Sequence, residues 1–433
     1  MKLILGGTII DPYNGVEYQK DILIKDGKIA QVAENIDVSA YKEKVQVIDA
    51  TGKKIGPGLV DVHVHFRDPG FTYKEDIETG AKAAAAGGYT AVVLMANTKP
   101  TVDNEETLSY VLKKGEKTAI HVHTCGAITK SLQGEVMTDM AALKAAGAVG
   151  FTDDGIPVLS EDLVKEAMEQ AVKLNVPLSF HEEDPAYIDN NGINRGKASA
   201  HFEIGGSDRR AEISLVERDL ELALSTGATF NVQHISAKES VELVRRAKER
   251  AVQLGQSNIH AEATPHHFSL TEDAAIEHGT LAKMNPPLRE EEDRMAVIKG
   301  LMDGTIDLIA TDHAPHSAEE KNRCITEAPS GIVGLETAFA LAITYLIKPG
   351  YLTLVQLFER MSLAPSQMYH LPYGKIEEGN FADMIIFDDE QKVTFNKFLS
   401  RSSNSPFLGQ TFYGRIEMTI CRGEIAFDRN QCE

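Results

Sequence analysis

Eight short runs of β-type residues alternate with amphipathic helical runs between about residues 56 and 364, and this alternation constrains the fold most strongly. Helical patterns such as EDLVKEAMEQAVKL and RDLELALSTG lie between the runs. Such alternation is typical of βα units around a parallel sheet, and eight units predict a (β/α)₈ TIM barrel. The runs are VDVHVH (60–65), AVVLM (91–95), AIHVH (119–123), VGFT (149–152), LSFH (178–181), FNVQH (230–234), IHAEA (259–263) and DLIATD (307–312).

The two ends of the chain differ from this middle part. Residues 1–55 and 366–433 consist of strand-and-turn sequences, such as LILGGTIID and IEMTICRGEIAFD, punctuated by DG, GG and RG. Neither piece alone is expected to bury a good core, so both ends together are predicted to form one small discontinuous β domain. The expected α/β fold is therefore a catalytic barrel at 56–365 with a β domain built from both chain ends.

Charge and apolar patterning narrow the function classes. A formal net charge of −20 opposes binding to nucleic acid or anionic membranes, because the field repels polyanions. No stretch approaches the roughly 20 apolar residues of a membrane span, and the start MKLILGGTIIDP reads as a strand rather than a signal peptide. The four cysteines (Cys125, Cys324, Cys421 and Cys432) are scattered without a CxxC pair, as expected of reduced thiols. A cytoplasmic protein acting on a small molecule is expected.

The ends of the predicted strands carry chemically active side chains. His63 and His65 alternate with valines, so both imidazoles lie on one face of the first strand. An isolated pair of this kind could equally be structural. In a TIM barrel, however, the carboxyl ends of all strands meet at one mouth, where active sites are found. Four later strand ends supply further candidates: Asp153 or Asp154, His181, His234 and Asp312.

This set of side chains predicts a metal centre. Imidazole nitrogen and carboxylate oxygen suit Zn²⁺ or a similar divalent ion. Six ligands exceed what one tetrahedral zinc ion needs, and a carboxylate can bridge two ions. Two ions roughly 3.5–4 Å apart can polarise one carbonyl together, so a dinuclear hydrolytic zinc site is predicted. The histidine pairs 121/123 and 266/267 are expected to have structural roles and to form the wall of the mouth, respectively.

Motifs along most of the chain resemble those of the cyclic amidohydrolase branch of the amidohydrolase superfamily, and most closely the dihydroorotase family of the longer bacterial type. The motifs are GPGLVDVHVHFRDPG, MANTKPTVDN, GFTDDG, TPHHFSLTED, KMNPPLR, IATDHAPH and GLETAFA. The resemblance implies reversible interconversion of N-carbamoyl-L-aspartate and (S)-dihydroorotate, a step of de novo pyrimidine synthesis. It also implies a homodimer and an association with aspartate carbamoyltransferase of the same pathway.

The resemblance implies roles for individual residues as well. His63 and His65 would hold one zinc ion, His181 and His234 a second, and Asp154 would bridge the two. Asp312 would be the catalytic acid/base and would also touch the first ion. The implied substrate-binding residues are His65, Arg67, Asn97, Asn285 and His316, together with the backbone of Ser330 and Gly331.

Elementary chemistry agrees with the assignment of Arg67. Dihydroorotate bears a carboxylate on a cyclic amide, and a planar, always-charged guanidinium can fork two hydrogen bonds onto that group. Arg67 lies two residues beyond His65, so it must approach the metals rather than form a surface ion pair. Asn97 and Asn285 follow strands and could read the carboxylate and the ring amide, or merely form turns beside proline.

Three alternatives are open at this stage. Hydantoinases and allantoinases bridge their metals with a carbamylated lysine at the fourth strand, whereas that strand here reads VGFTDDG, with Lys144 lying earlier in a helical run. The bridge is therefore assigned to a carboxylate, to Asp154 by motif position, with Asp153 as the alternative. A hydantoinase-type or allantoinase-type activity, or an inactive barrel that acts as a scaffold, are the competing functions.

Overall fold

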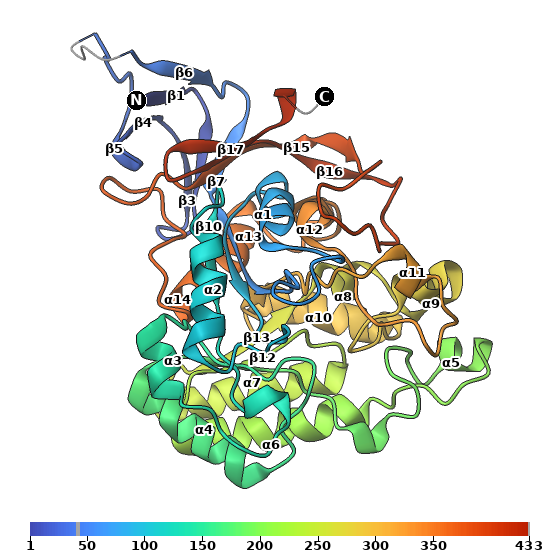
Figure 1. The fold of residues 1–433 in the computed structure, drawn as a ribbon. Coiled ribbons are helices and arrows are strands. Elements are labelled where there is room, and N and C mark those ends of the chain that lie inside the picture. The colour runs from blue at the N-terminus through green and yellow to red at the C-terminus, as the bar shows by residue number, and fades with distance from the viewer. Residues whose placement is uncertain (40–43, 432–433) are drawn as a thin grey trace.

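A ring of parallel strands forms the middle of the molecule in the computed structural model, which describes residues 1–39 and 44–431 (Figure 1). Three strands form one sheet and four form another, and every pairing within both sheets is parallel. They are β8 (Leu59–Val64), β9 (Tyr89–Leu94), β10 (His121–Thr124), β11 (Leu178–Phe180), β12 (Phe230–Val232), β13 (Ile259–Ala263) and β14 (Leu308–Ile309).

Single parallel bridges join the two sheets into a closed ring. Phe151 pairs with Gly126, just after β10, and with Leu178 in β11. On the other side His313, which follows β14, pairs with Val64 in β8. The predicted TIM barrel is confirmed.

The fourth barrel position is shorter than the sequence predicts. The run 149–152 was expected to be a strand, but only Phe151 makes bridges there. The reason lies in the next residue. The Asp153 carboxylate accepts hydrogen bonds from the backbone N–H groups of Ile128 and Thr129, at 2.7 and 3.0 Å, and so turns the chain out of the ring.

Helices surround the ring, as expected for a barrel of this type. The segment EDLVKEAMEQAVKL forms α4 (Glu161–Leu174), which begins at the N-cap Ser160 and buries Val164, Ala167 and Met168. The other longer helices are α1 (Ile77–Ala86), α2 (Glu105–Gly115), α6 (Arg210–Thr226), α7 (Lys238–Gln253), α10 (Glu291–Asp303) and α12 (Leu335–Ala342). Shorter helices are α3 (Met140–Ala146), α5 (Lys197–His201), α8 (Pro265–Ser269), α9 (Glu272–His278), α11 (Ala318–Lys321), α13 (Leu354–Phe358) and α14 (Ala364–Met368).

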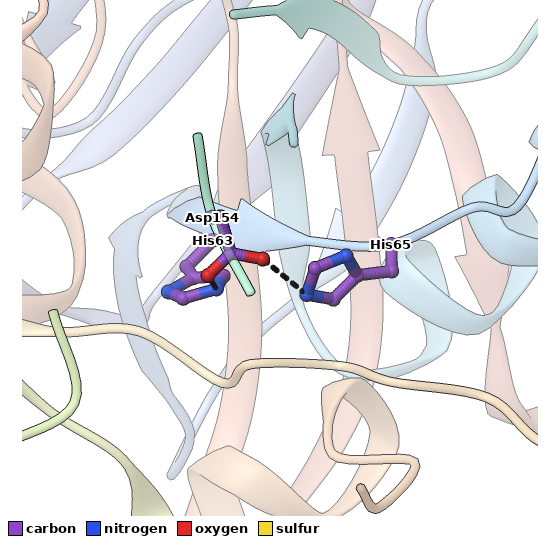
Figure 2. Close-up of side chains that lie close together, drawn as sticks. All are labelled: His63, His65 and Asp154. Carbon is purple, nitrogen blue, oxygen red and sulfur yellow. Dashed lines mark ion pairs between the residues drawn. The ribbon is translucent and has the colours of Figure 1, made fainter. Parts of the chain in front are cut away.

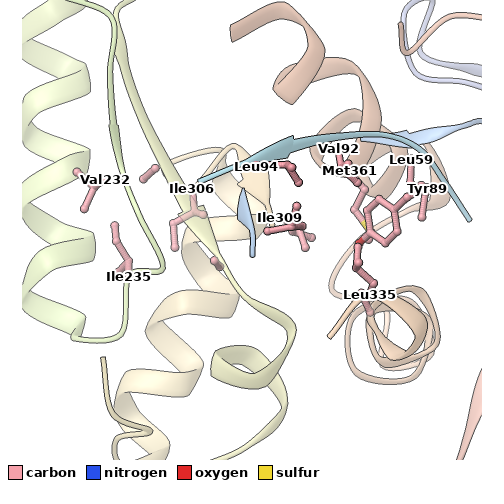
Figure 3. Close-up of a cluster of buried hydrophobic side chains, with 14 of the residues drawn as sticks. Leu59, Tyr89, Val92, Leu94, Val232, Ile235, Ile306, Ile309, Leu335 and Met361 are labelled. Atoms are coloured by element: carbon pink, nitrogen blue, oxygen red, sulfur yellow. The ribbon is translucent and has the colours of Figure 1, made fainter. Parts of the chain in front are cut away.

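One large apolar cluster joins the ring to its helices. Figure 3 shows strand residues Leu59, Tyr89 and Val92 beside Met361 and Leu335 from the C-terminal helical region. Each fully buried large apolar side chain stabilises the fold by about 1.5–3 kcal/mol relative to an exposed one. The barrel is therefore a packed support for its loops, not a pore.

Strands from both chain ends share a sheet at the top of Figure 1. In this six-stranded sheet, β7 (Lys54–Pro57) pairs antiparallel with β15 (Met384–Thr394), which aligns Ile55 with Ile386. The sheet also contains β2 (Thr8–Asp11), β3 (Val16–Gln19), β16 (Thr411–Cys421) and β17 (Glu424–Asp428), and a second sheet contains β1 (Lys2–Leu5), β4 (Asp21–Lys25), β5 (Lys28–Ala33) and β6 (Gln46–Asp49). These pairings support the discontinuous β domain, whose boundaries near 55 and 366 stay a prediction.

Within the described residues, no helix has the length and apolar character needed to cross a bilayer. Cys125, Cys324 and Cys421 are free thiols, while Cys432 lies outside the described residues.

Candidate metal centre

His63 in β8 and His65, which directly follows β8, face one carboxylate, that of Asp154 (Figure 2). Asp154 Oδ1 lies 3.3 Å from His63 Nε2, and its Oδ2 lies 3.4 Å from His65 Nε2. All three side chains are buried, and their candidate ligand atoms lie within 4.8 Å of one another. The geometry can hold a metal ion between the two imidazoles and the carboxylate.

Asp154 also belongs to a second group of three. His181 Nδ1 and His234 Nε2 lie 3.0 Å apart, and His181 Nδ1 is 3.8 Å from Asp154 Oδ1. Ligand atoms of these three residues also lie within 4.8 Å of one another. Asp154 thus faces all four histidines, whereas the Asp153 carboxylate is bound to the backbone as described above. Of the two alternatives, only Asp154 has the position of a bridge.

Asp312 lies at the first group. Its Oδ1 is 3.1 Å from His65 Nε2 and 3.6 Å from His63 Nε2. The structure therefore brings together all six side chains predicted as metal ligands, from five different positions around the ring.

Three of the predicted functional residues have left-handed backbone conformations. The φ angles are +57° for Arg67, +29° for His234 and +47° for Asp312. Non-glycine residues rarely adopt positive φ, and such strain persists where the surroundings over-determine it, most often at functional sites. Strand ends that turn this sharply present their side chains to the mouth of the barrel.

Outer hydrogen bonds orient the imidazoles. His63 Nδ1 lies 2.5 Å from Glu262 Oε1, and His181 Nε2 lies 3.0 Å from Glu183 Oε2. His65 Nδ1 lies 2.9 Å from Asn97 Oδ1. Each bond uses one ring nitrogen and leaves the other facing the centre, which is how metal-binding histidines are usually held.

Sequence reasoning missed the two glutamates in this set. Glu262 lies in the apolar run IHAEA, where a carboxylate inside a buried strand was an available signal. Glu183 lies only two residues beyond His181, but a polar residue in a loop carries no comparable signal. Asn97 was predicted to bind substrate, and here its Nδ2 also donates to Asp154 Oδ2 at 3.1 Å.

The electrostatics of the cluster suit a divalent cation. His63 Nε2 is buried, faces the centre and has no hydrogen-bond partner among the described residues. Burial opposes ionisation of Asp154, but His63 and His65 hold the pKa of its carboxyl well below its usual range. Burial lowers the pKa of His234, and the neighbouring His181 and His63 lower it further, which favours a neutral ligand imidazole. For His63, Glu262 and Asp154 outweigh burial and raise the pKa, so a metal there would replace a proton.

A cavity of about 320 Å³ opens beside the histidines. It contains the predicted substrate residues except His316, and its lining is His65, Arg67, Asn97, Asp154, Gly155, His181, Asn191, His234, Asn285, Asp312, Ala314, Pro329, Ser330 and Gly331. Asn191 was not predicted, because nothing distinguishes it from a turn residue in DNNG.

Arg67 is the cation of this cavity. Its partly buried guanidinium donates from Nε to the Pro315 carbonyl at 3.3 Å. Burial lowers its pKa, which Asp312 and Asp154 oppose, and a guanidinium remains charged in any case. Within the described part of the chain, no carboxylate forms an ion pair with it at 4.0 Å or less. A partly buried cation in this position favours an anionic ligand.

The remaining predicted residues take varied positions. Asn285 Oδ1 is a buried acceptor without a partner among the described residues. Gly331 N–H already donates to the Lys283 carbonyl at 2.9 Å, so this loop forms a wall of the cavity rather than offering that N–H. Burial, Arg67 and Lys74 lower the pKa of His316, which lies beside the cavity next to Gly331.

Neither of the other histidine pairs reaches the centre. His121 Nε2 lies 2.9 Å from Asp383 Oδ2, and His123 Nε2 lies 3.0 Å from the Tyr373 hydroxyl, as expected of structural residues. His266 and His267 are buried and do not line the cavity, so the expectation that they form its wall is wrong.

Known proteins resemble the chain in both sequence and structure. Residues 52–240 match the family model described as dihydro-orotase-like. The chain is 51% identical over 428 residues to a dihydroorotase of Clostridioides difficile, covering 99% of this chain and 100% of the relative. It is 48% identical over 430 residues to a dihydroorotase of Clostridium acetobutylicum, with the same coverage. Among solved structures, an L-hydantoinase from Arthrobacter aurescens superposes with a TM-score of 0.87 at 25% identity, covering 99% of this chain and 96% of that one. A D-hydantoinase from a Bacillus species superposes with a TM-score of 0.84 at 22% identity, covering 100% and 96%, and shows the shared fold.

Proposed function

The chain belongs to the dihydroorotase family, and from that premise we propose that it interconverts N-carbamoyl-L-aspartate and (S)-dihydroorotate in de novo pyrimidine synthesis. The observation that carries the proposal is the partly buried Arg67 in one cavity with His65, His181, His234 and Asp154 of the candidate metal centre. A cyclic amide bearing a carboxylate presents complementary groups: the anion to the guanidinium, and the amide to the centre.

The donor set fits zinc, with imidazole nitrogens and carboxylate oxygens and no thiolate. In this proposal His63 and His65 would hold one ion, His181 and His234 would hold a second, and Asp154 would contribute to both sites. Asp312 also touches the first ion. Divalent ions held there would supply Lewis-acid polarisation of the amide carbonyl and would lower the pKa of water toward about 7.

Side chains around the cavity orient the substrate. Arg67 forks two hydrogen bonds onto the substrate carboxylate. Asn285 Oδ1, which has no partner in the part of the chain that the structure describes, is suited to accept a hydrogen bond from a ring N–H. Asn97 and His65 in the cavity, and His316 beside it, complete the set of substrate-binding side chains, and the backbone of Ser330 and Gly331 forms a wall of the cavity.

Asp312 moves the proton. In hydrolysis its carboxylate takes a proton from the water that attacks the ring amide carbonyl, and it returns the proton to the ring nitrogen as the C–N bond breaks. In ring closure it takes a proton from the attacking ureido nitrogen and gives it to the departing carboxylate oxygen, which leaves as hydroxide; one further proton from the solvent converts the hydroxide to water. The 3.1 Å distance between Asp312 Oδ1 and His65 Nε2 supports this role.

The nearest alternative is a hydantoinase-type or allantoinase-type hydrolase. Two features count against it: Arg67 in the cavity, and a fourth-position sequence, VGFTDDG, without a lysine. The test is turnover of dihydroorotate, hydantoin and allantoin by the zinc-loaded protein. We expect turnover of dihydroorotate alone, and activity only on the other two compounds would overturn the proposal.

An inactive scaffold is the second alternative, and metal analysis tests it. A purified protein that holds no divalent metal and gains no activity with added zinc would favour the scaffold. We further propose a cytoplasmic homodimer that associates with aspartate carbamoyltransferase. Sedimentation of the pure protein, alone and mixed with that enzyme, tests both assemblies.

A further inference from the structure

A segment of the C-terminal region reaches the mouth of the barrel. It lies between β15 and β16, spans residues 395–410, and is anchored on the loop that follows β8. Ser402 Oγ donates to the Lys74 carbonyl at 2.6 Å, and Arg401 N–H donates to the Glu75 carboxylate at 3.2 Å. These contacts connect residues more than 320 positions apart in the chain, so this segment is built onto the edge of the proposed active site.

Asn404, in this segment, forms hydrogen bonds to two residues of the cavity wall. It is buried, and its Oδ1 accepts a hydrogen bond from His316 N–H at 3.0 Å. Its Nδ2 donates to the carbonyls of Ala314 and Gly331, at 3.1 and 3.0 Å. The orientation of the amide is unambiguous, because a backbone N–H can only donate and a carbonyl can only accept. Every hydrogen of the Asn404 amide is used.

These three bonds join two separate loops. Ala314 and His316 follow β14, whereas Gly331 belongs to the loop before α12. The backbones approach so closely that a Cβ at Gly331 would lie 2.7 Å from Ala314 Cβ. Ala314 and Gly331 both line the cavity. A change in the spacing of the two loops would therefore change the width of the cavity at its wall.

We propose that Asn404 is a positioning residue for substrate binding: it sets the spacing between the His316 loop and the Ser330–Gly331 loop, so that the C-terminal segment completes the active site. The inference rests on the proposed function, because it takes these two loops as the walls that grip the substrate. Within the described part of the chain, the hydrogen bonds of Asn404 go to His316, Ala314, Gly331 and Val333 and to none of the six proposed metal ligands. Its effect should therefore appear in substrate binding and not in metal content.

The test is Asn404→Asp, which keeps the size of the side chain and replaces the donor Nδ2 by an acceptor. That acceptor faces two carbonyl oxygens, so repulsion must displace the side chain or the two loops. A matched control is Asn258→Asp. Asn258 is likewise a buried asparagine whose Nδ2 donates to two carbonyls, those of Ala223 and Ala228, but it lies directly before β13, at the amino ends of the strands.

We expect Asn404→Asp to raise the KM for dihydroorotate at least about tenfold, with kcat changed less than about threefold and zinc content unchanged. Asn258→Asp should lower the thermal midpoint but leave KM at the wild-type value. If Asn404→Asp does not fold, Asn404→Ser, which removes the bonds without adding a charge, is measured in the same way. An unchanged KM, an equal rise in the Asn258 variant, or loss of zinc would overturn the inference.

Turnover of dihydroorotate by the wild-type protein distinguishes a failure of the proposed function from a failure of this inference. If the zinc-loaded wild type does not turn over dihydroorotate, the proposed function fails. The same KM comparison is then made with whichever of hydantoin and allantoin the wild type hydrolyses, and the same outcomes decide the role of Asn404.

Discussion

Hydrogen bonds fix the orientation of individual residues at the candidate metal centre. Glu262 lies against one nitrogen of His63 and also accepts from Asn231 Nδ2, at 2.9 Å. The opposite nitrogen of His63 has no hydrogen-bond partner within residues 1–39 and 44–431 and faces Asp154. A cluster held this way is preorganised, because a metal need not reorient its ligands on binding.

Glu262→Gln tests this orientation. An amide can donate to His63 Nδ1, which would favour the tautomer whose proton lies on the metal-facing nitrogen, so we expect zinc affinity to fall about 10- to 100-fold. Competition with a metal-buffering dye measures the affinity. Glu212→Gln is the control, since Glu212 is a buried carboxylate that binds the backbone at Ser236 and Ala237. Equal affinities in both variants would contradict the role assigned to Glu262.

Asp312→Asn tests proton transfer. The amide keeps the shape but cannot take a proton, so we expect kcat to fall by about 10²- to 10⁴-fold. Dihydroorotate affinity, measured by calorimetry, should stay within a few-fold of wild type. Near-normal turnover would exclude Asp312 as the acid/base.

Arg67→Ala and Arg67→Lys separate charge from geometry at the substrate carboxylate. Alanine should weaken dihydroorotate binding by roughly 2–3 kcal/mol, and lysine by less, because it restores the charge without the fork. Zinc content should not change in either variant. Loss of zinc would show that Arg67 supports the ligands instead of the substrate.

The strands and helices of the barrel position these residues. The sequence predicted a strand or helix well where a local periodic pattern of apolar residues marks it. The strand ends at His63, His181 and His234 were identified correctly because each follows a β-type run. The fourth strand was predicted to be longer than it is, because the turn at Asp153 depends on hydrogen bonds to the backbone of a distant segment. Such non-local bonds leave no trace in a local pattern.

Helix α12 contacts the C-terminal segment 395–410 through the carboxyl of Glu336. Glu336 in its first turn accepts hydrogen bonds from Leu399 N–H at 2.8 Å and Ser400 N–H at 3.1 Å, and so holds the C-terminal segment. Burial raises the pKa of this carboxyl to about 7, and the nearby Glu75 adds to the effect. At a pH between the ordinary pKa of a glutamate and about 7, Glu336 is therefore protonated in the folded state but ionised in the unfolded chain. Its contribution to stability falls as pH rises through that interval.

We accordingly expect Glu336→Gln to raise the thermal midpoint relative to wild type by about 1–2 °C at pH 8, and by less at pH 5. The glutamine carbonyl can still accept from both N–H groups. Glu78→Gln, at an exposed site on α1, is the control and should show no such pH trend. A difference that grows toward low pH would contradict the assigned direction.

The whole molecule joins distant parts of the chain. That both ends form one β domain was expected, because neither end could bury its own isoleucines, and β7 indeed pairs with β15. That residues 395–410 reach the barrel mouth could not be predicted, since Asn404 reads locally as a turn residue in SNSP. The net charge of −20 describes the whole chain and does not indicate that the cavity contains a positive charge, that of Arg67.

Metal removal tests the coupling between the centre and the fold. An ion that binds only the folded state stabilises it by about 2.7 kcal/mol when its free concentration is 100-fold above Kd. We expect chelator-treated protein to unfold at a lower temperature and added zinc to restore the midpoint. A His181→Ala variant should show a smaller gain, and an equal gain would locate the stabilising ion elsewhere.

The most direct test of the whole account is anomalous diffraction at the zinc edge from crystals of the zinc-loaded protein with dihydroorotate. We predict two anomalous peaks, one beside His63 and His65 and one beside His181 and His234, with Asp154 between them and the substrate carboxylate against Arg67. The absence of both peaks, or a substrate bound away from Arg67, would contradict the account.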